Sequence, residues 1–108
     1  MKENIFENIK VNKDKEQFND IINTKDVRIE RIVSNGQTSE QDFWYDQNEN
    51  EFVVVLKGRA ILQIKQNNEI KEYVLNQGDY LNINANIKHR VKYTSLDEPT
   101  VWLAVFYK

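Results

Sequence analysis

Residues 51–83 read EFVVVLKGRAILQIKQNNEIKEYVLNQGDYLNI and hold four short apolar runs separated by turn-forming residues. The first run, residues 51–57, has an unbroken apolar centre, as expected for a strand that is buried on both faces. Residues 60–65 and 80–83 alternate apolar and polar side chains, which is the period of a half-buried strand. Between the second and third runs stands QNNE, and Asn tolerates the positive φ of a tight hairpin turn. The stretch therefore predicts four strands joined by short turns.

The same pattern continues on both sides of this stretch. Residues 27–32 alternate and precede an Asn-Gly turn at 35–36, and residues 42–45 are typical of a short aromatic strand. Residues 90–94 and 101–107 give the last two strands. Seven or eight short strands at regular spacing predict an all-β sandwich or barrel. We assign this barrel to residues 27–108.

Residues 1–26 are expected to form an arm and a short N-terminal helix that pack on the barrel. The helix is predicted over residues 13–23, because Phe18, Ile21 and Ile22 follow the i, i+3, i+4 spacing of a helical apolar face. Asp14 is placed to cap its start. The apolar stripe is narrow, so the helix should lie on the outside.

The preceding arm, residues 5–11, has a strand-like pattern of apolar residues. Such an arm could cross to the sheet of a second copy and cover an otherwise exposed sheet edge. We therefore expect a homodimer.

Composition narrows the classes of function. The 108 residues carry a formal net charge of -2, so the chain lacks the basic surface that binds nucleic acid. Cysteine is absent, which excludes disulfides, thiolate zinc sites and cysteine nucleophiles. No stretch approaches the roughly 18 apolar residues of a membrane span, and the N-terminus lacks the apolar core of a signal peptide. We expect a cytoplasmic protein that binds neither nucleic acid nor membrane.

The only histidine, His89, is the first candidate for chemistry. Neutral imidazole is the commonest metal ligand and the usual acid or base near neutral pH. His89 stands where a polar, Asn-rich loop leads into the strand predicted at residues 90–94. A lone histidine on a strand can equally be a packed, hydrogen-bonded residue, so both interpretations stay open at this point. No arrangement of serine and histidine suggests a catalytic triad, and no glycine-rich phosphate loop is present.

Residues 78–89 resemble the second motif of the cupin family. That motif consists of Gly, five residues, Pro-x-Gly, two residues and His. Gly78 and His89 keep this spacing, while Asn84 and Asn86 replace the proline and the glycine. Segments 43–47, 78–81, 89–91 and 102–105 are similar to those of a bacterial subset of small single-domain cupins. The resemblance covers roughly residues 28–107 and implies an antiparallel jelly-roll β-barrel.

The first cupin motif ends in Glu, six residues and Gly, and Glu51 and Gly58 fit that spacing. In the family, this glutamate, two upstream histidines and the histidine of the second motif hold a metal ion. Here no histidine lies upstream. By spacing, Gln47 takes the second-histidine position and Tyr45 the first, or Asp46 and Trp44 take them if the gap is one residue longer.

The resemblance therefore implies a weak site for Mn, Fe, Ni or Zn, with Gln47, Glu51 and His89 as ligands. Its affinity should be low, because an amide oxygen is a poorer ligand than imidazole. The alternative is a metal-free barrel mouth in which the three side chains hydrogen-bond each other or a small ligand.

Aromatic residues add candidates for a ligand pocket, although strand aromatics are also typical of a core. The candidates are Trp44, Tyr45, Tyr80 and Trp102. The leading hypothesis is a cupin that binds a small molecule around His89 and Glu51, with dioxygenase, isomerase or lyase chemistry if a metal assists. The alternative is a non-catalytic binding or sensing module. The sequence does not decide whether the chain is an enzyme, because fold alone does not fix function.

Overall fold

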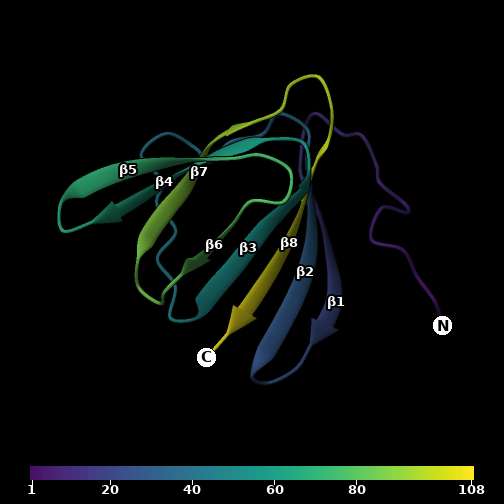
Figure 1. The fold of residues 1–108 in the computed structure, drawn as a ribbon, viewed down its shortest axis with the longest axis horizontal. Helices are drawn as coiled ribbons and strands as arrows, with labels where there is room; N and C mark the ends of the chain where they lie inside the picture. Colours follow the sequence, from purple (N-terminus) through teal and green to yellow (C-terminus); the bar gives the residue numbers. More distant parts are fainter.

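The structure, a computed structural model, describes all 108 residues and contains eight strands (Figure 1). They are β1 (Gln17–Asn23), β2 (Val27–Ser34), β3 (Asn50–Lys57), β4 (Ala60–Gln66), β5 (Glu69–Leu75), β6 (Tyr80–Ile83), β7 (Lys88–Thr94) and β8 (Thr100–Tyr107). The larger sheet has the order β1-β2-β8-β3-β6 and the smaller one β5-β4-β7. Every strand pairing is antiparallel, which confirms the predicted all-β jelly roll. No helix that could cross a membrane is found.

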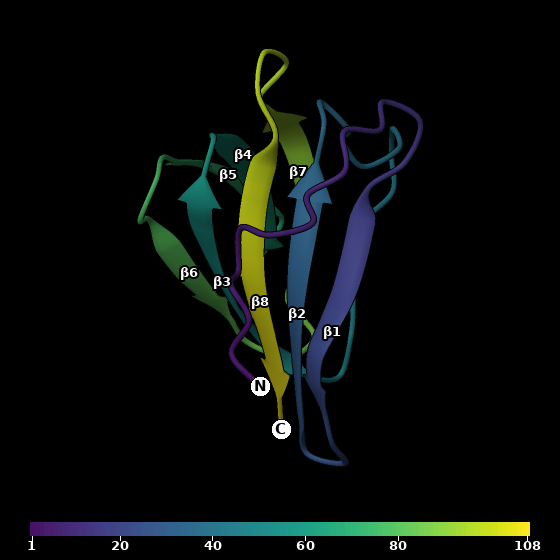
Figure 2. The same cartoon turned by 90° about the vertical axis from the view of Figure 1, so that its right-hand side faces the viewer.

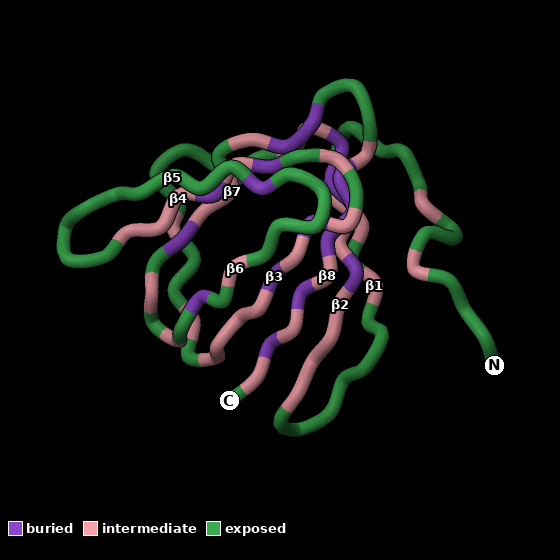
Figure 3. The backbone as a smooth tube through the Cα atoms, in the orientation of Figure 1, coloured by how far each residue is buried: buried purple, intermediate pink, exposed green.

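The two sheets pack face to face around one core. Val53, Val55, Ile83 and Trp102 come from the larger sheet, and they meet Ala60, Leu62 and Leu75 of the smaller sheet. Buried positions alternate with more exposed ones along β3, β4 and β8 (Figure 3), as the period of two requires. The unbroken apolar centre of β3 reflects its place inside the larger sheet, between β8 and β6.

The predicted turns form where asparagine takes the left-handed conformation. Asn67 and Asn68 have φ of 54° and 65° and join β4 to β5. Asn86, which stands where the second motif has glycine, has a φ of 68°. Asparagine adopts this region more readily than other non-glycine residues, so the replacement preserves the turn that leads to His89.

The helix predicted over residues 13–23 is wrong. Residues 17–23 form β1, the edge strand beside β2, with a bulge between Asp20 and Ile22. Phe18 pairs with Ile32 and Ile22 with Ile29, and positions 29 and 32 lie on opposite faces of β2. The spacing that mimicked one face of a helix therefore comes from the two faces of a bulged strand.

Two shorter predicted strands also differ from the structure. Residues 42–45 form no strand, and only Tyr45 makes an isolated bridge, to His89. The arm at residues 5–11 forms a turn at 5–8 and crosses the outer face of the larger sheet (Figure 2). The guanidinium of Arg31 donates hydrogen bonds to the carbonyls of Ile5 and Glu7. The arm is therefore attached to its own sheet, and the homodimer stays a prediction.

Two glycines allow a test of how closely the turn between β3 and β4 is packed. Gly58 lies in this turn, and Gly78, between β5 and β6, serves as the control. Gly58 has a φ of +85°, and a Cβ there would lie 2.6 Å from Thr100 Oγ1 and 2.8 Å from Thr100 Cα. Gly78 has a φ of +91° but open space around its Cβ position. We expect Gly78→Ala to lower the free energy of unfolding by about 1 kcal/mol through backbone strain alone. Gly58→Ala should cost roughly 1–3 kcal/mol more, because the methyl group overlaps Thr100.

Urea denaturation of the two variants beside the wild-type protein measures this difference. Equal losses of stability would show that the close approach of Thr100 to Gly58 does not affect the free energy of unfolding.

Candidate functional site

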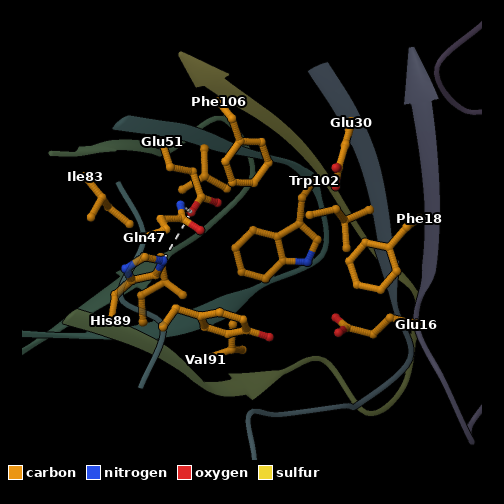
Figure 4. A pocket seen from close by; sticks show the side chains of 14 residues that line it. Glu16, Phe18, Glu30, Gln47, Glu51, Ile83, His89, Val91, Trp102 and Phe106 are labelled. Atoms are coloured by element: carbon orange, nitrogen blue, oxygen red, sulfur yellow. Dashed lines mark hydrogen bonds and ion pairs between the residues drawn. The ribbon is translucent and has the colours of Figure 1, made fainter. Parts of the chain in front are cut away.

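A cavity of about 130 Å³ lies between the two sheets (Figure 4). Nine of its 14 lining residues are hydrophobic. The larger sheet contributes Ile32, Val53, Trp102 and Phe106, and the smaller sheet contributes Leu62 and Val91. The walls are therefore mostly apolar, and the few polar side chains stand out as the places where chemistry or recognition can occur.

One polar group is formed by His89, Glu51 and Gln47. His89 near the start of β7 and Glu51 in β3 belong to different sheets, and Nε2 of His89 lies 3.1 Å from Oε1 of Glu51. Gln47 Nε2 donates to the same carboxylate oxygen over 3.1 Å. The side chains of His89 and Glu51 are only 8% and 13% exposed. The three residues predicted from the cupin motifs are thus brought together at one end of the cavity.

The hydrogen bonds of His89 favour the charged form of its ring. Nδ1 lies 3.0 Å from the carbonyl oxygen of Ile87, which can only accept, so Nδ1 carries a proton. A hydrogen bond from Nε2 to an ionised Glu51 then requires the second ring proton. Burial is the largest influence and lowers the pKa of His89, but the hydrogen bonds to Glu51 and Ile87 and the charges of Glu51 and Asp46 together raise it above 6.5.

The loop before β3 brings Tyr45 and Gln47 to this site. Backbone hydrogen bonds run from Tyr45 N to His89 O over 2.8 Å and from His89 N to Tyr45 O over 3.1 Å. The Tyr45 ring stacks on the imidazole of His89, with 5.7 Å between ring centroids. Asn86 N donates to the carbonyl of Gln47 over 2.8 Å. The turn of the second motif and the loop of the first are therefore joined by backbone hydrogen bonds.

The aromatic residues predicted for the pocket divide into two groups. Tyr45 and Trp102 line the cavity. Trp44 lies outside it, where its ring faces Lys65 Nζ at 5.7 Å and the Arg90 guanidinium at 5.9 Å. Tyr80 is also outside, 65% exposed and packed against Phe52.

Sequence reasoning missed the other end of the cavity, which is lined by Glu16, Phe18 and Glu30. Figure 4 shows these three side chains on the opposite side of Trp102 from His89 and Glu51. Glu30 could have been found, because it shares a strand face with Ile32 in the stretch predicted at residues 27–32. Glu16 and Phe18 could not, because their position depends on β1, where a helix was expected.

The donor set does not fit a resident Mn, Fe, Ni or Zn ion. It offers one imidazole, one carboxylate and one neutral amide, and nowhere do three His, Cys, Asp or Glu side chains gather as potential ligands. His89 and Glu51 already satisfy each other, and it is the amide nitrogen of Gln47 that faces the carboxylate. Because such ions are held most strongly by imidazole and charged donors, this set would compete poorly for them.

Comparisons with known proteins agree with the fold and with the two motifs. Residues 30–106 match the family model described as Cupin domain. A crystal structure from Ralstonia eutropha JMP134, with a provisional assignment as a mannose-6-phosphate isomerase, is 38% identical over 100% of this chain and 98% of its own, with a TM-score of 0.91.

Two more distant structures share the fold. A cupin superfamily protein from Desulfitobacterium hafniense DCB-2 is 13% identical, covers 92% of this chain and 83% of its own, and has a TM-score of 0.74. Hydroxypropylphosphonic acid epoxidase from S. wedmorenis is 18% identical, covers 85% of this chain and 50% of its own, and has a TM-score of 0.70. A search of curated proteins gives no match.

The charge of His89 can be measured directly, because the chain has no other histidine. We expect the ring signals in an NMR titration to give a pKa above 6.5. Glu51→Gln should lower that pKa, because burial is then opposed only by the Ile87 carbonyl and the charge of Asp46. Glu98→Gln, an equal change of charge on an exposed loop, is the control and should leave it unchanged.

The same pair predicts how stability depends on pH. Since the folded-state pKa of His89 lies above 6.5, its contribution to stability is complete below about pH 6.5 and is lost as the pH rises through the folded-state value. Denaturation curves should show this loss in the wild-type protein and a smaller one in Glu51→Gln. A wild-type pKa at or below 6.5 would contradict the imidazolium–carboxylate pair.

Proposed function

Since the chain belongs to the cupin-domain family, we propose that it binds a small molecule in the cavity between its sheets, without the help of a metal ion. The observation that carries the proposal is the buried cluster of His89, Glu51 and Gln47 at one end of an otherwise apolar cavity. A mostly apolar pocket with a few convergent polar groups is the usual design of a small-molecule site.

The size of the cavity limits the ligand. Its volume of about 130 Å³ is close to the roughly 150 Å³ of an apolar cavity that holds a benzene ring. Glu51 Oε2 and Gln47 Oε1 make no hydrogen bond within the protein, so both can accept one from a ligand. These features favour a single ring or short chain that carries a hydroxyl or N–H donor.

A phosphorylated sugar is a poorer candidate, although the similar Ralstonia eutropha protein has a provisional assignment to such a substrate. Proteins recognise phosphate through Arg, Lys or the N-terminus of a helix. None of the 14 residues that line this cavity is Arg or Lys, and the chain forms no helix. A phosphate group would instead meet the carboxylates of Glu16, Glu30 and Glu51.

Filling the cavity tests its role in binding. We expect benzyl alcohol to shift the NMR signals of His89 in the wild-type protein and to raise the melting temperature. Val91→Trp should abolish both effects, because the indole occupies the cavity. Val74→Trp, on exposed β5, adds the same side chain outside the cavity and should retain both.

Unchanged binding in Val91→Trp would place the ligand elsewhere. If neither benzyl alcohol nor any other single-ring or short-chain compound bound the wild-type protein, the proposal would fail.

Elemental analysis tests the absence of a resident metal. Protein purified without chelators and without a nickel column should hold far less than one Mn, Fe, Ni or Zn per chain. Added Zn or Mn should not raise its melting temperature, because the donor set binds such ions weakly. One equivalent of metal that is lost in His89→Ala would overturn this part of the proposal and support metal-assisted dioxygenase, isomerase or lyase chemistry.

A further inference from the structure

We propose that the ligand of this cavity is a cation, a small amine whose ammonium group binds Glu16 and whose apolar body lies against Phe18 and Trp102. This inference rests on the proposed function and specifies the chemical class of the ligand. It is carried by the distribution of charge in the cavity, by the hydrogen bonds that fix Glu16 and by the aromatic walls.

The charges that line the cavity leave one carboxylate without a basic partner. Three lining residues are acidic, and His89 is the only basic one. Glu51 is paired with His89, and Glu30 with Arg28, whose Nε lies 2.8 Å from Glu30 Oε2. No Lys, Arg or His lies within ion-pair distance of Glu16. Glu16 therefore supplies an uncompensated negative charge at its end of the cavity.

A chain of hydrogen bonds holds this carboxylate in place. The indole N–H of Trp102 donates to Ser34 Oγ over 3.1 Å, and the Ser34 hydroxyl donates to Glu16 Oε2. Indole can only donate, so Ser34 Oγ accepts from Trp102 and keeps its own proton for Glu16 Oε2, which accepts as an ionised carboxylate does. Ser34 is fully buried. Glu16 Oε1 makes no hydrogen bond within the protein and remains free to accept one from a ligand.

Aromatic rings line the space that a ligand would fill, with Trp102 and Phe106 buried and Phe18 and Tyr45 59% and 43% exposed. Phe18, Tyr45, Trp102 and Phe106 all line the cavity, and a cation over an aromatic face is attracted by the ring quadrupole. Three carboxylates and a single basic residue line the same space, which makes the cavity unfavourable for an anion and favourable for an ammonium ion.

Three compounds with the same ring isolate the effect of charge. Benzylamine is a cation at neutral pH, benzyl alcohol is neutral and benzoate is an anion. We expect calorimetry to show benzylamine binding about tenfold more tightly than benzyl alcohol, because its hydrogen bond to Glu16 is charge-assisted, and benzoate binding least tightly. Added salt should weaken the binding of benzylamine and leave that of benzyl alcohol nearly unchanged.

Two variants separate Glu16 from the overall negative charge of the chain. Glu16→Gln keeps an oxygen that can accept from Ser34, so the protein should fold while the preference for benzylamine disappears. Glu98→Gln makes the same change of charge on an exposed loop and should keep the preference.

The outcomes distinguish this inference from the proposed function. If benzyl alcohol or benzoate bound as tightly as benzylamine, the preference for a cationic ligand would be refuted. The proposal that small molecules bind in the cavity would be unaffected. If Glu16→Gln kept the preference, the role of Glu16 would be refuted. If none of the three compounds bound, the cationic single-ring ligand and the binding of small rings in this cavity would both be refuted.

Discussion

The hydrogen bond between His89 and Glu51 joins the two sheets at one end of the cavity, because β7 carries one partner and β3 the other. Both side chains are largely buried, so each would be costly without its partner, and breaking such a pair costs roughly 3–5 kcal/mol. The pair thus holds together two strands that share no backbone hydrogen bonds. It also gives the cavity a polar end in which the strongest donor and acceptor already satisfy each other.

The loop that completes the site has no strand of its own and depends on β7 for its position. Ser39 N donates to Val91 O over 2.9 Å, and Arg90 donates to the carbonyls of Ser39 and Glu40. The same guanidinium donates to Gln63 and lies near the Trp44 ring. Arg90 is a charged strand residue, a type that usually faces solvent, yet it holds the loop that presents Tyr45 and Gln47. The polar end of the cavity therefore depends on contacts outside the cavity.

Sequence predicted the parts of the structure that depend on local pattern. The Asn67-Asn68 turn and the spacing from Gly78 to His89 follow from residue type and period. The spacing of Phe18 and Ile22 was interpreted as a helical turn, whereas it comes from a bulge in β1. The segment forms a strand because it pairs with β2, which lies outside the segment. Tyr80 could have been excluded by parity, since it shares a face with Asn82 and not with buried Ile83. Nothing local indicates Glu16, whose position is set by Ser34 in the neighbouring strand.

The cavity and the core are built from the same residues. Val53, Leu62, Ile83 and Trp102 belong to the hydrophobic cluster and also line the cavity, so the binding site is a part of the core left unfilled. This space is not closed, since two of its lining residues, Phe18 and Tyr45, are 59% and 43% exposed. Further apolar side chains in place of Glu16 and Glu30 would fill this space and remove two charges from a partly buried site. Glu16 and Glu30 instead place two carboxylates in the lining, and a ligand of opposite charge would gain contacts with them on binding.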